Sequence, residues 1–176
     1  DKVHEQAAEN LERVLSDSHS GYSKPAAVIL ESVQGEGGTI IPSPGFLQRV
    51  REITEQHGIL LICDEIQSGL GRTGKMFAFE HAGIVPDIVT MSKALGGVGF
   101  PISAIAYREE LNTWPAGKTI GTFRGNMIAY AAGNAALKWM REHELVEHAA
   151  ELGEIGLKKL KEIEAKRATV GESRGL

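Results

Sequence analysis

Strand-like runs of residues recur along this chain, and three of them end beside a charged residue. Short, unbroken apolar runs are typical of strands that are buried on both faces of a sheet. Helix-like segments separate the runs, and strands that alternate with helices predict a largely parallel sheet in an α/β domain. We expect strands at residues 26–30, 59–63, 87–91 and 102–107.

The predicted helices carry apolar residues at the spacing of one helix face. Pro44 suits the first turn of the second helix, because the N–H that proline lacks has no partner there. We expect helices at residues 3–18, 44–57, 126–143 and 144–166.

Charged side chains follow three of the predicted strands. Glu31 and Asp64 come at the ends of the first two, and Lys93 follows the third. In sheets of this class, ligands bind at the carboxyl ends of the strands. The three side chains therefore predict a site at that edge of the sheet.

Charge and composition limit the partners of such a site. A net charge of −4 and a pI near 5.9 disfavour nucleic acid and anionic membranes, because these attract clustered Lys and Arg. The single cysteine, Cys63, excludes an intramolecular disulfide and suits a reducing compartment such as the cytoplasm. We expect no membrane span, since no run of about 18 apolar residues occurs. A small-molecule ligand and no metal site are expected.

Gly69, Gly71 and Gly74 spell G-x-G-x-x-G, a pattern found in dinucleotide-binding loops. In those loops the first glycine directly follows a strand and a helix begins at the last. Here five residues intervene, and two of them are acidic and would repel a pyrophosphate. A P-loop would need Ser or Thr at the position of Met76. We expect a glycine-rich loop that binds no nucleotide.

Asp64 and Lys93 follow successive buried strands, so both can face one crevice. A carboxylate and an amine in one crevice suit pyridoxal 5'-phosphate (PLP): the aldehyde of PLP needs a lysine, and its ring nitrogen needs an acidic partner. The alternative is a loop-capping aspartate and a solvated lysine, and the residue types alone leave both interpretations open.

Four segments, in this order, resemble motifs of the class III aminotransferases, which are PLP enzymes of fold type I. They are residues 31–38, 62–74, 87–97 and 121–126. The resemblance extends from about residue 26 to residue 176. It implies an α/β fold, namely part of the large domain of the fold type I PLP-dependent transferases, with a mostly parallel sheet and flanking helices.

The resemblance also implies a domain organisation. Family members are more than twice as long as this chain of 176 residues, which begins without methionine, so we expect a piece truncated at both ends. Residues 1–143 would form a partial PLP-binding large domain. Residues 144–176 would form a long connecting helix and the start of the C-terminal small domain.

Individual residues match the family's functional positions. Lys93 matches the lysine that forms a Schiff base with PLP and moves the proton, and Asp64 matches the partner of the ring nitrogen. Gln67 matches the residue that contacts the phenolic oxygen. Thr122 matches a threonine that reaches the phosphate in the neighbouring subunit, which implies a homodimer or higher oligomer with shared sites. Glu36 matches a substrate-gating glutamate.

Within the family, the segment from Lys93 to Asn126 is most similar to the diaminobutyrate:2-oxoglutarate aminotransferases. The implied activity is ping-pong transamination from the terminal amine of a diamino acid, such as 2,4-diaminobutyrate, to 2-oxoglutarate. Racemisation or decarboxylation by a PLP enzyme of the same fold is one alternative. A fragment without activity as an isolated chain is the other.

Overall fold

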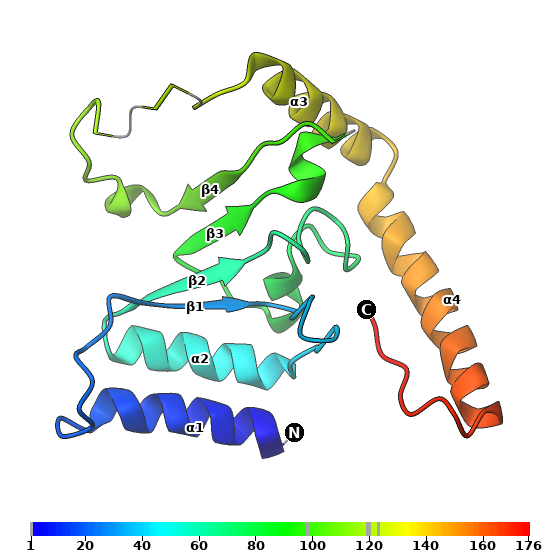
Figure 1. Cartoon of the computed structure of the whole chain (residues 1–176), viewed down its shortest axis with the longest axis horizontal. Helices are drawn as coiled ribbons and strands as arrows, with labels where there is room; N and C mark the ends of the chain where they lie inside the picture. Colours follow the sequence, from blue (N-terminus) through cyan, green and yellow to red (C-terminus); the bar gives the residue numbers. More distant parts are fainter. Residues whose placement is uncertain (1, 98, 119–120, 123) are drawn as a thin grey trace.

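The computed structural model describes residues 2–97, 99–118, 121–122 and 124–176. Its centre is a four-stranded sheet with the strand order β1-β2-β3-β4 (Figure 1). The strands are β1 (Ala27–Glu31), β2 (Leu60–Asp64), β3 (Ile88–Met91) and β4 (Ala104–Tyr107). The first three run parallel, and β4 runs antiparallel to β3. The predicted α/β fold with a largely parallel sheet is therefore confirmed.

The α-helices lie close to the segments that the apolar spacing predicted. They are α1 (Lys2–Ser16), α2 (Pro44–Gln56), α3 (Met127–Glu142) and α4 (Leu145–Lys166). Short 3₁₀ turns at residues 78–82, 93–96 and 109–111 were not predicted, because one turn is too short to show a helical repeat. No described helix combines the length and hydropathy required to cross a bilayer.

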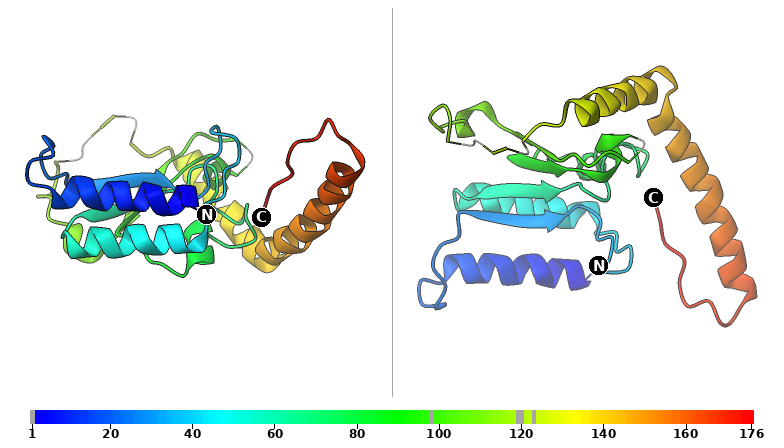
Figure 2. Two further views of the ribbon diagram at one scale, coloured as in Figure 1. Left: turned by 90° about the horizontal axis from the view of Figure 1, so that it is seen from below. Right: turned by 45° about the horizontal axis from the view of Figure 1, so that its top comes forward.

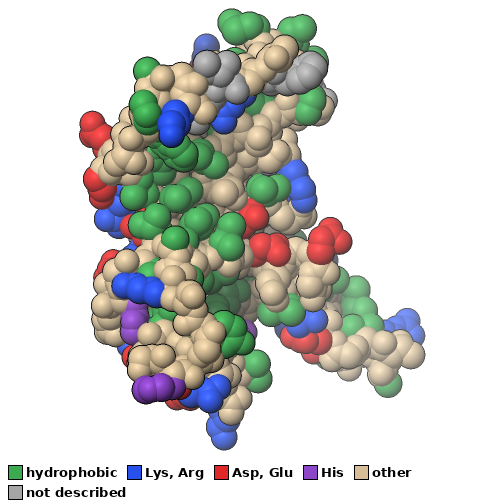
Figure 3. All heavy atoms as spheres, turned by 60° about the vertical axis from the view of Figure 1, so that its left-hand side comes forward, with side chains coloured by type: hydrophobic (Ala, Val, Ile, Leu, Met, Phe, Trp, Pro, Cys, Tyr) green, Lys and Arg blue, Asp and Glu red, His purple; other side chains and the backbone are tan. Residues whose placement is uncertain are grey.

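The hydrophobic core covers one face of the sheet. Leu61 and Cys63 of β2 and Val89 of β3 pack with residues of α2 and of the segment after β2, namely Leu47, Val50, Phe79, Ala82 and Ile84. Figure 2 shows α1 and α2 beside the sheet, whereas α4 projects away from it. In Figure 3, hydrophobic side chains gather in the middle of one face of the molecule, next to acidic ones.

Side chains on the other face of the sheet form rows across the strands, because successive residues of a strand point to opposite faces. The register pairs Ile29 with Ile62, and Ile29 is 62% exposed. Two residues further along, Glu31 pairs with Asp64, and Asp64 pairs with Thr90 of β3. This uncovered face therefore ends in a polar row at the carboxyl ends of the strands.

A buried carboxylate ties the opposite end of the sheet together. Asp87, just before β3, is 8% exposed and accepts a 2.8 Å hydrogen bond from the backbone N–H of Leu61. Its carboxylate also lies 2.8 Å from Arg51 Nη1 and 3.0 Å from Arg108 Nε. Burial alone would raise the pKa of Asp87, but these hydrogen bonds and charges hold it below its ordinary value of 3.8.

The Asp87→Asn variant of the full-length protein should lose about 3 kcal/mol in free energy of unfolding, since it removes the buried charge partner of Arg51 and leaves only the exposed Glu55. Because the pKa is lower in the folded state, the carboxylate stabilises the fold above its ordinary pKa near 3.8. That contribution is lost as the pH falls through the lower, folded-state value. Urea unfolding at pH 7 and at pH 3 should therefore show a smaller difference from the wild type at pH 3.

Glu55→Gln is the matched control. Glu55 pairs with Arg51 at 3.0 Å, but its side chain is 61% exposed. An exposed pair contributes less than about 1 kcal/mol. Equal destabilisation by Asp87→Asn and Glu55→Gln would contradict the role given to the buried carboxylate.

Candidate active site

The parallel strands bring Asp64 and Lys93 to the same edge of the sheet. Asp64 is the last residue of β2, and Lys93 begins the 3₁₀ turn two residues after β3. Asp64 is half-buried, and its Oδ1 accepts a 3.0 Å hydrogen bond from the backbone N–H of Ile66. This local turn leaves the second carboxylate oxygen of Asp64 available for another partner.

Gln67 joins this pair through its side chain. Lys93 Nζ donates a hydrogen bond to Gln67 Oε1, across 26 positions of the sequence. The backbone of Lys93 has φ 48°, in the left-handed region, which costs a residue with a Cβ roughly 1–2 kcal/mol. Strained backbone of this kind occurs where surrounding structure holds it in place, often at functional sites.

The loop after β1 closes in on Gln67. A Cβ placed on Gly35 would lie 2.8 Å from Gln67 Cγ, so a larger residue would push Gln67 away. The loop is fastened to β1 by a 2.8 Å hydrogen bond from the Gly35 N–H to Glu31 Oε2. The glycine in the Gln34-Gly35-Glu36 motif therefore has a packing reason.

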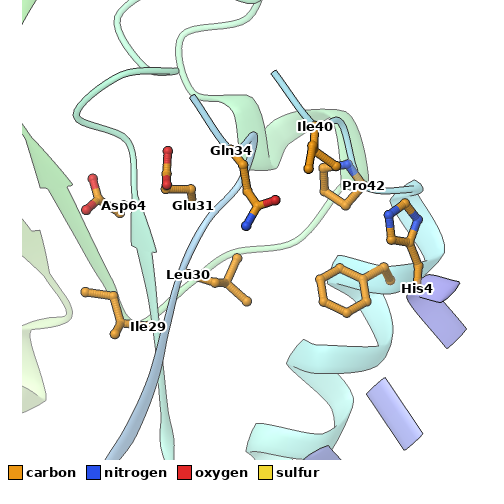
Figure 4. Close-up of a pocket in the computed structure, with 9 residues that line it drawn as sticks. His4, Ile29, Leu30, Glu31, Gln34, Ile40, Pro42 and Asp64 are labelled. Carbon is orange, nitrogen blue, oxygen red and sulfur yellow. The ribbon is translucent and has the colours of Figure 1, made fainter. Parts of the chain in front are cut away.

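Two hollows adjoin these residues. One, of about 520 Å³, is lined by Asp64, Glu31 and Gln34 together with apolar side chains from β1 and α2. Figure 4 shows Asp64 and Glu31 extending side by side in the same direction, with Gln34 beyond them. A smaller hollow, of about 290 Å³, is lined by Gln67, Glu36, Arg72 and nearby loop residues. The polar edge of the sheet therefore has room for small molecules.

The predicted site residues fall into two groups. Asp64, Gln67 and Lys93 lie at or just after the carboxyl ends of β2 and β3, with Gln67 and Lys93 joined by a hydrogen bond. Glu36 is exposed and shares the smaller hollow with Gln67. Thr122 is exposed in the turn before α3, and within the described part of the chain it makes no hydrogen bond to the other group. Its neighbour Phe123, in the same motif, lies outside the described residues.

The glycines after Asp64 serve packing. Gly71 and Gly74 have φ values of 86° and 75°. A Cβ on Gly74 would lie 2.7 Å from the Cβ of Ala150 in α4, and one on Gly71 would lie 3.1 Å from Met140 Cε in α3. A 3₁₀ turn at residues 78–82 follows this loop, with no α-helix beginning at its last glycine. The loop thus lacks the helix end that binds phosphate in a dinucleotide site.

Glu65 has a structural role that the motif did not reveal. It is 1% exposed, and its carboxylate accepts hydrogen bonds from Ser68 Oγ (2.8 Å) and from the N–H groups of Ala78 (3.0 Å) and Phe79 (3.1 Å). Strand alternation could have predicted this buried position, because Glu65 lies on the same side of the strand as Leu61 and Cys63, which face the core. Cys63 is equally buried, and desolvation raises the pKa of its thiol to about 11, which makes it a poor nucleophile.

Comparisons with known proteins identify the family of this chain. A family model described as aminotransferase class III matches residues 1–176. The diaminobutyrate–2-oxoglutarate aminotransferase of Haemophilus influenzae is 52% identical over 166 residues, which are 94% of this chain and 36% of that protein. The protein of the same name from Rhizobium meliloti is 51% identical, over 96% of this chain and 36% of the relative. The chain thus spans about a third of the length of these relatives.

A solved structure of a known enzyme has the same fold. The ornithine aminotransferase from Toxoplasma gondii, described with partial occupancy of PLP at its active site, superposes with a TM-score of 0.87 at 36% identity. The match covers 96% of this chain and 39% of that one. The expected fold, part of a larger PLP-dependent transferase, is therefore confirmed.

Proposed function

Because the chain belongs to the class III aminotransferase family, we propose that the full-length protein is a PLP-dependent aminotransferase that uses Lys93 and Asp64 for its chemistry. The observation that carries this proposal is the contact between Lys93 Nζ and Gln67 Oε1 at the strand end that also bears Asp64. The amine comes from the turn after β3, and the carboxylate and the amide come from the end of β2 and the loop that follows it.

The chemistry of these side chains fits PLP. The Lys93 amine can hold the cofactor covalently, the Asp64 carboxylate can accept a hydrogen bond from a protonated ring nitrogen, and the Gln67 amide can donate one to a phenolic oxygen. The space that a Cβ at Gly35 would fill is taken by the Gln67 side chain, which keeps the amide close to this edge. When bound, PLP supplies an electron sink for the bonds at the donor carbon.

The chain's own residues handle the proton. With PLP and substrate bound, the Lys93 amine would take the proton from the donor carbon and later return one. The Asp64 carboxylate would keep a proton on the ring nitrogen, because a carboxylate beside that nitrogen favours its charged form. Gln67 orients the lysine, since its Oε1 accepts from Lys93 Nζ.

Thr122 and Glu36 complete the proposed site. Thr122 would contact the phosphate of PLP in a neighbouring subunit, so the active form would be a homodimer or a higher oligomer with shared sites. Its exposure in the described chain leaves it accessible for that contact. Glu36, in the hollow beside Gln67, would gate the amino donor and the dicarboxylate acceptor.

We place the protein in the cytoplasm.

The proposed domain organisation follows the path of the chain. Residues 1–143 would be part of the PLP-binding large domain. Residues 144–176 would be the connecting helix and the start of the small domain. The break between α3 and α4, where Glu144 has φ 48°, supports a boundary at this point.

The proposed reaction is ping-pong transfer of the terminal amino group of a diamino acid, most simply 2,4-diaminobutyrate, to 2-oxoglutarate. It is supported by the names of the two relatives that are 52% and 51% identical. These relatives are aminotransferases, which favours transamination over racemisation or decarboxylation. The chain spans only 36% of their length, so the proposal concerns the full-length protein.

Lys93→Ala should abolish covalent attachment of PLP and lower kcat about 10²- to 10⁴-fold, the usual contribution of a general base. Attachment is measured by borohydride reduction of the full-length protein, followed by mass analysis of the peptide that contains residue 93. Lys75→Ala, at an exposed lysine in the glycine loop, is the control and should behave as wild type. Attachment of PLP at another lysine would contradict the assignment.

Among 2,4-diaminobutyrate, ornithine, 4-aminobutyrate and β-alanine, the diaminobutyrate should give the highest kcat/KM with 2-oxoglutarate as acceptor. Formation of glutamate by the full-length protein measures this. A lack of turnover with every diamine would contradict the proposed donor. Interconversion of the enantiomers of one amino acid without a keto acid would instead indicate a racemase.

A further inference from the structure

The turn that carries Lys93 has strained backbone. Lys93 is exposed within the described chain, and its backbone has φ 48°. The turn closes with hydrogen bonds of 3.0 Å from the Leu95 N–H to the Ser92 carbonyl and from the Gly97 N–H to the Ala94 carbonyl. A residue held at such a φ needs neighbouring structure to keep it there, so the position of the amine depends on what packs against this turn.

Helix α3 packs against the turn at two glycines (Figure 1). A Cβ on Gly133 of α3 would lie 2.6 Å from the carbonyl oxygen of Leu95. From the other side, a Cβ on Gly97 would lie 3.2 Å from the carbonyl oxygen of Ala132 and 3.2 Å from the Cβ of Ala136. The helix and the turn therefore approach so closely that Gly133 has no room for a side chain, and a side chain at Gly97 would require its neighbours to shift.

Glycine in the middle of a helix needs a reason, because it costs about 0.5–1 kcal/mol relative to alanine. Gly133 is buried, and Ala129, one turn before it, is completely buried. The obstacle at Gly133 is a backbone carbonyl, which cannot rotate away as a flexible side chain could. The contact with Leu95 accounts for this glycine.

We propose that Gly133 is a positioning residue for the transfer reaction: without a side chain, it lets α3 seat on the Leu95 carbonyl and thereby sets where Lys93 Nζ lies relative to Gln67 and Asp64. The role rests on the proposed function of Lys93. Gly133 itself contacts neither substrate nor cofactor. A Cβ at this position displaces the turn and moves the amine with it.

The first test compares Gly133→Ala with Gly156→Ala in the full-length protein loaded with PLP. Both replace a helical glycine with alanine, but nothing lies within 4 Å of a Cβ on Gly156. Gly133→Ala should lower kcat about tenfold or more, since a displacement of about 1 Å at a reacting group can cost 10²-fold. It should change KM less and shift the midpoint of the pH titration of the visible PLP band. Gly156→Ala should match wild type in all three.

A second pair of variants tests the same contact by changing the turn. Gly97 and Gly83 have similar φ values of 64° and 65°, but ψ is −113° at Gly97 and 25° at Gly83, so alanine is more strained at Gly97. Only Gly97 faces α3, whereas nothing lies within 4 Å of a Cβ on Gly83. Gly97→Ala should reproduce the loss of kcat and the shifted titration, and Gly83→Ala should lower the melting temperature without either effect. If Gly133→Ala folds poorly, the titration midpoint of the visible PLP band in its folded fraction decides the matter.

Two results would overturn the inference. If Gly133→Ala and Gly97→Ala keep the kcat and the titration midpoint of their controls, α3 does not position Lys93. If kcat falls equally in each variant and its control, the loss reflects general destabilisation. The proposed function is tested separately by wild-type protein alone, because its failure would appear as an absence of PLP on Lys93 before any glycine is changed.

Discussion

The parallel pairing of β1, β2 and β3 is the constraint on which the candidate site depends. Parallel strands present their carboxyl ends at one edge, and this pairing places Glu31, Asp64 and Thr90 in a single row. Lys93 follows the same edge two residues beyond β3. The Asp87 carboxylate bonds β2 to the start of β3 at the opposite end, so the register at the site is supported by a buried ionic contact far from it.

Glycines that allow two backbone segments to approach closely then position the candidate site residues at this edge of the sheet. Gly35 lets the loop after β1 reach Gln67, and Gly133 lets α3 reach the turn of Lys93. Gly71 and Gly74 seat the loop after Asp64 under α3 and α4. These contacts are short because the residues lack a Cβ, so the glycines locate the functional side chains without contacting any ligand.

The strands, the α-helices and the placement of Asp64 and Lys93 at the same edge of the sheet could be predicted from the sequence, because apolar periodicity and the residues at strand ends are local signals. The 3₁₀ turn at Lys93 is too short to produce a repeat. Glu65 follows Asp64 directly in the sequence, but strand alternation turns its side chain into the core, where it accepts hydrogen bonds from backbone N–H groups. The importance of Gly133 could not be predicted, because the atom that excludes a side chain there is the carbonyl oxygen of Leu95. Leu95 is 38 positions away in the sequence, and the contact depends on how α3 packs. Thr122 stays a prediction, because its proposed partner belongs to another subunit.

The central claim is that Asp64 and Lys93 hold one PLP molecule between them. The most direct measurement is a crystal structure of the full-length protein grown with PLP. The expected result is that Lys93 Nζ is bonded to the cofactor, that the Asp64 carboxylate lies within about 3.2 Å of the ring nitrogen, and that Gln67 lies at the phenolic oxygen. A ring nitrogen that faces another residue, or a cofactor bonded to a different lysine, would contradict it.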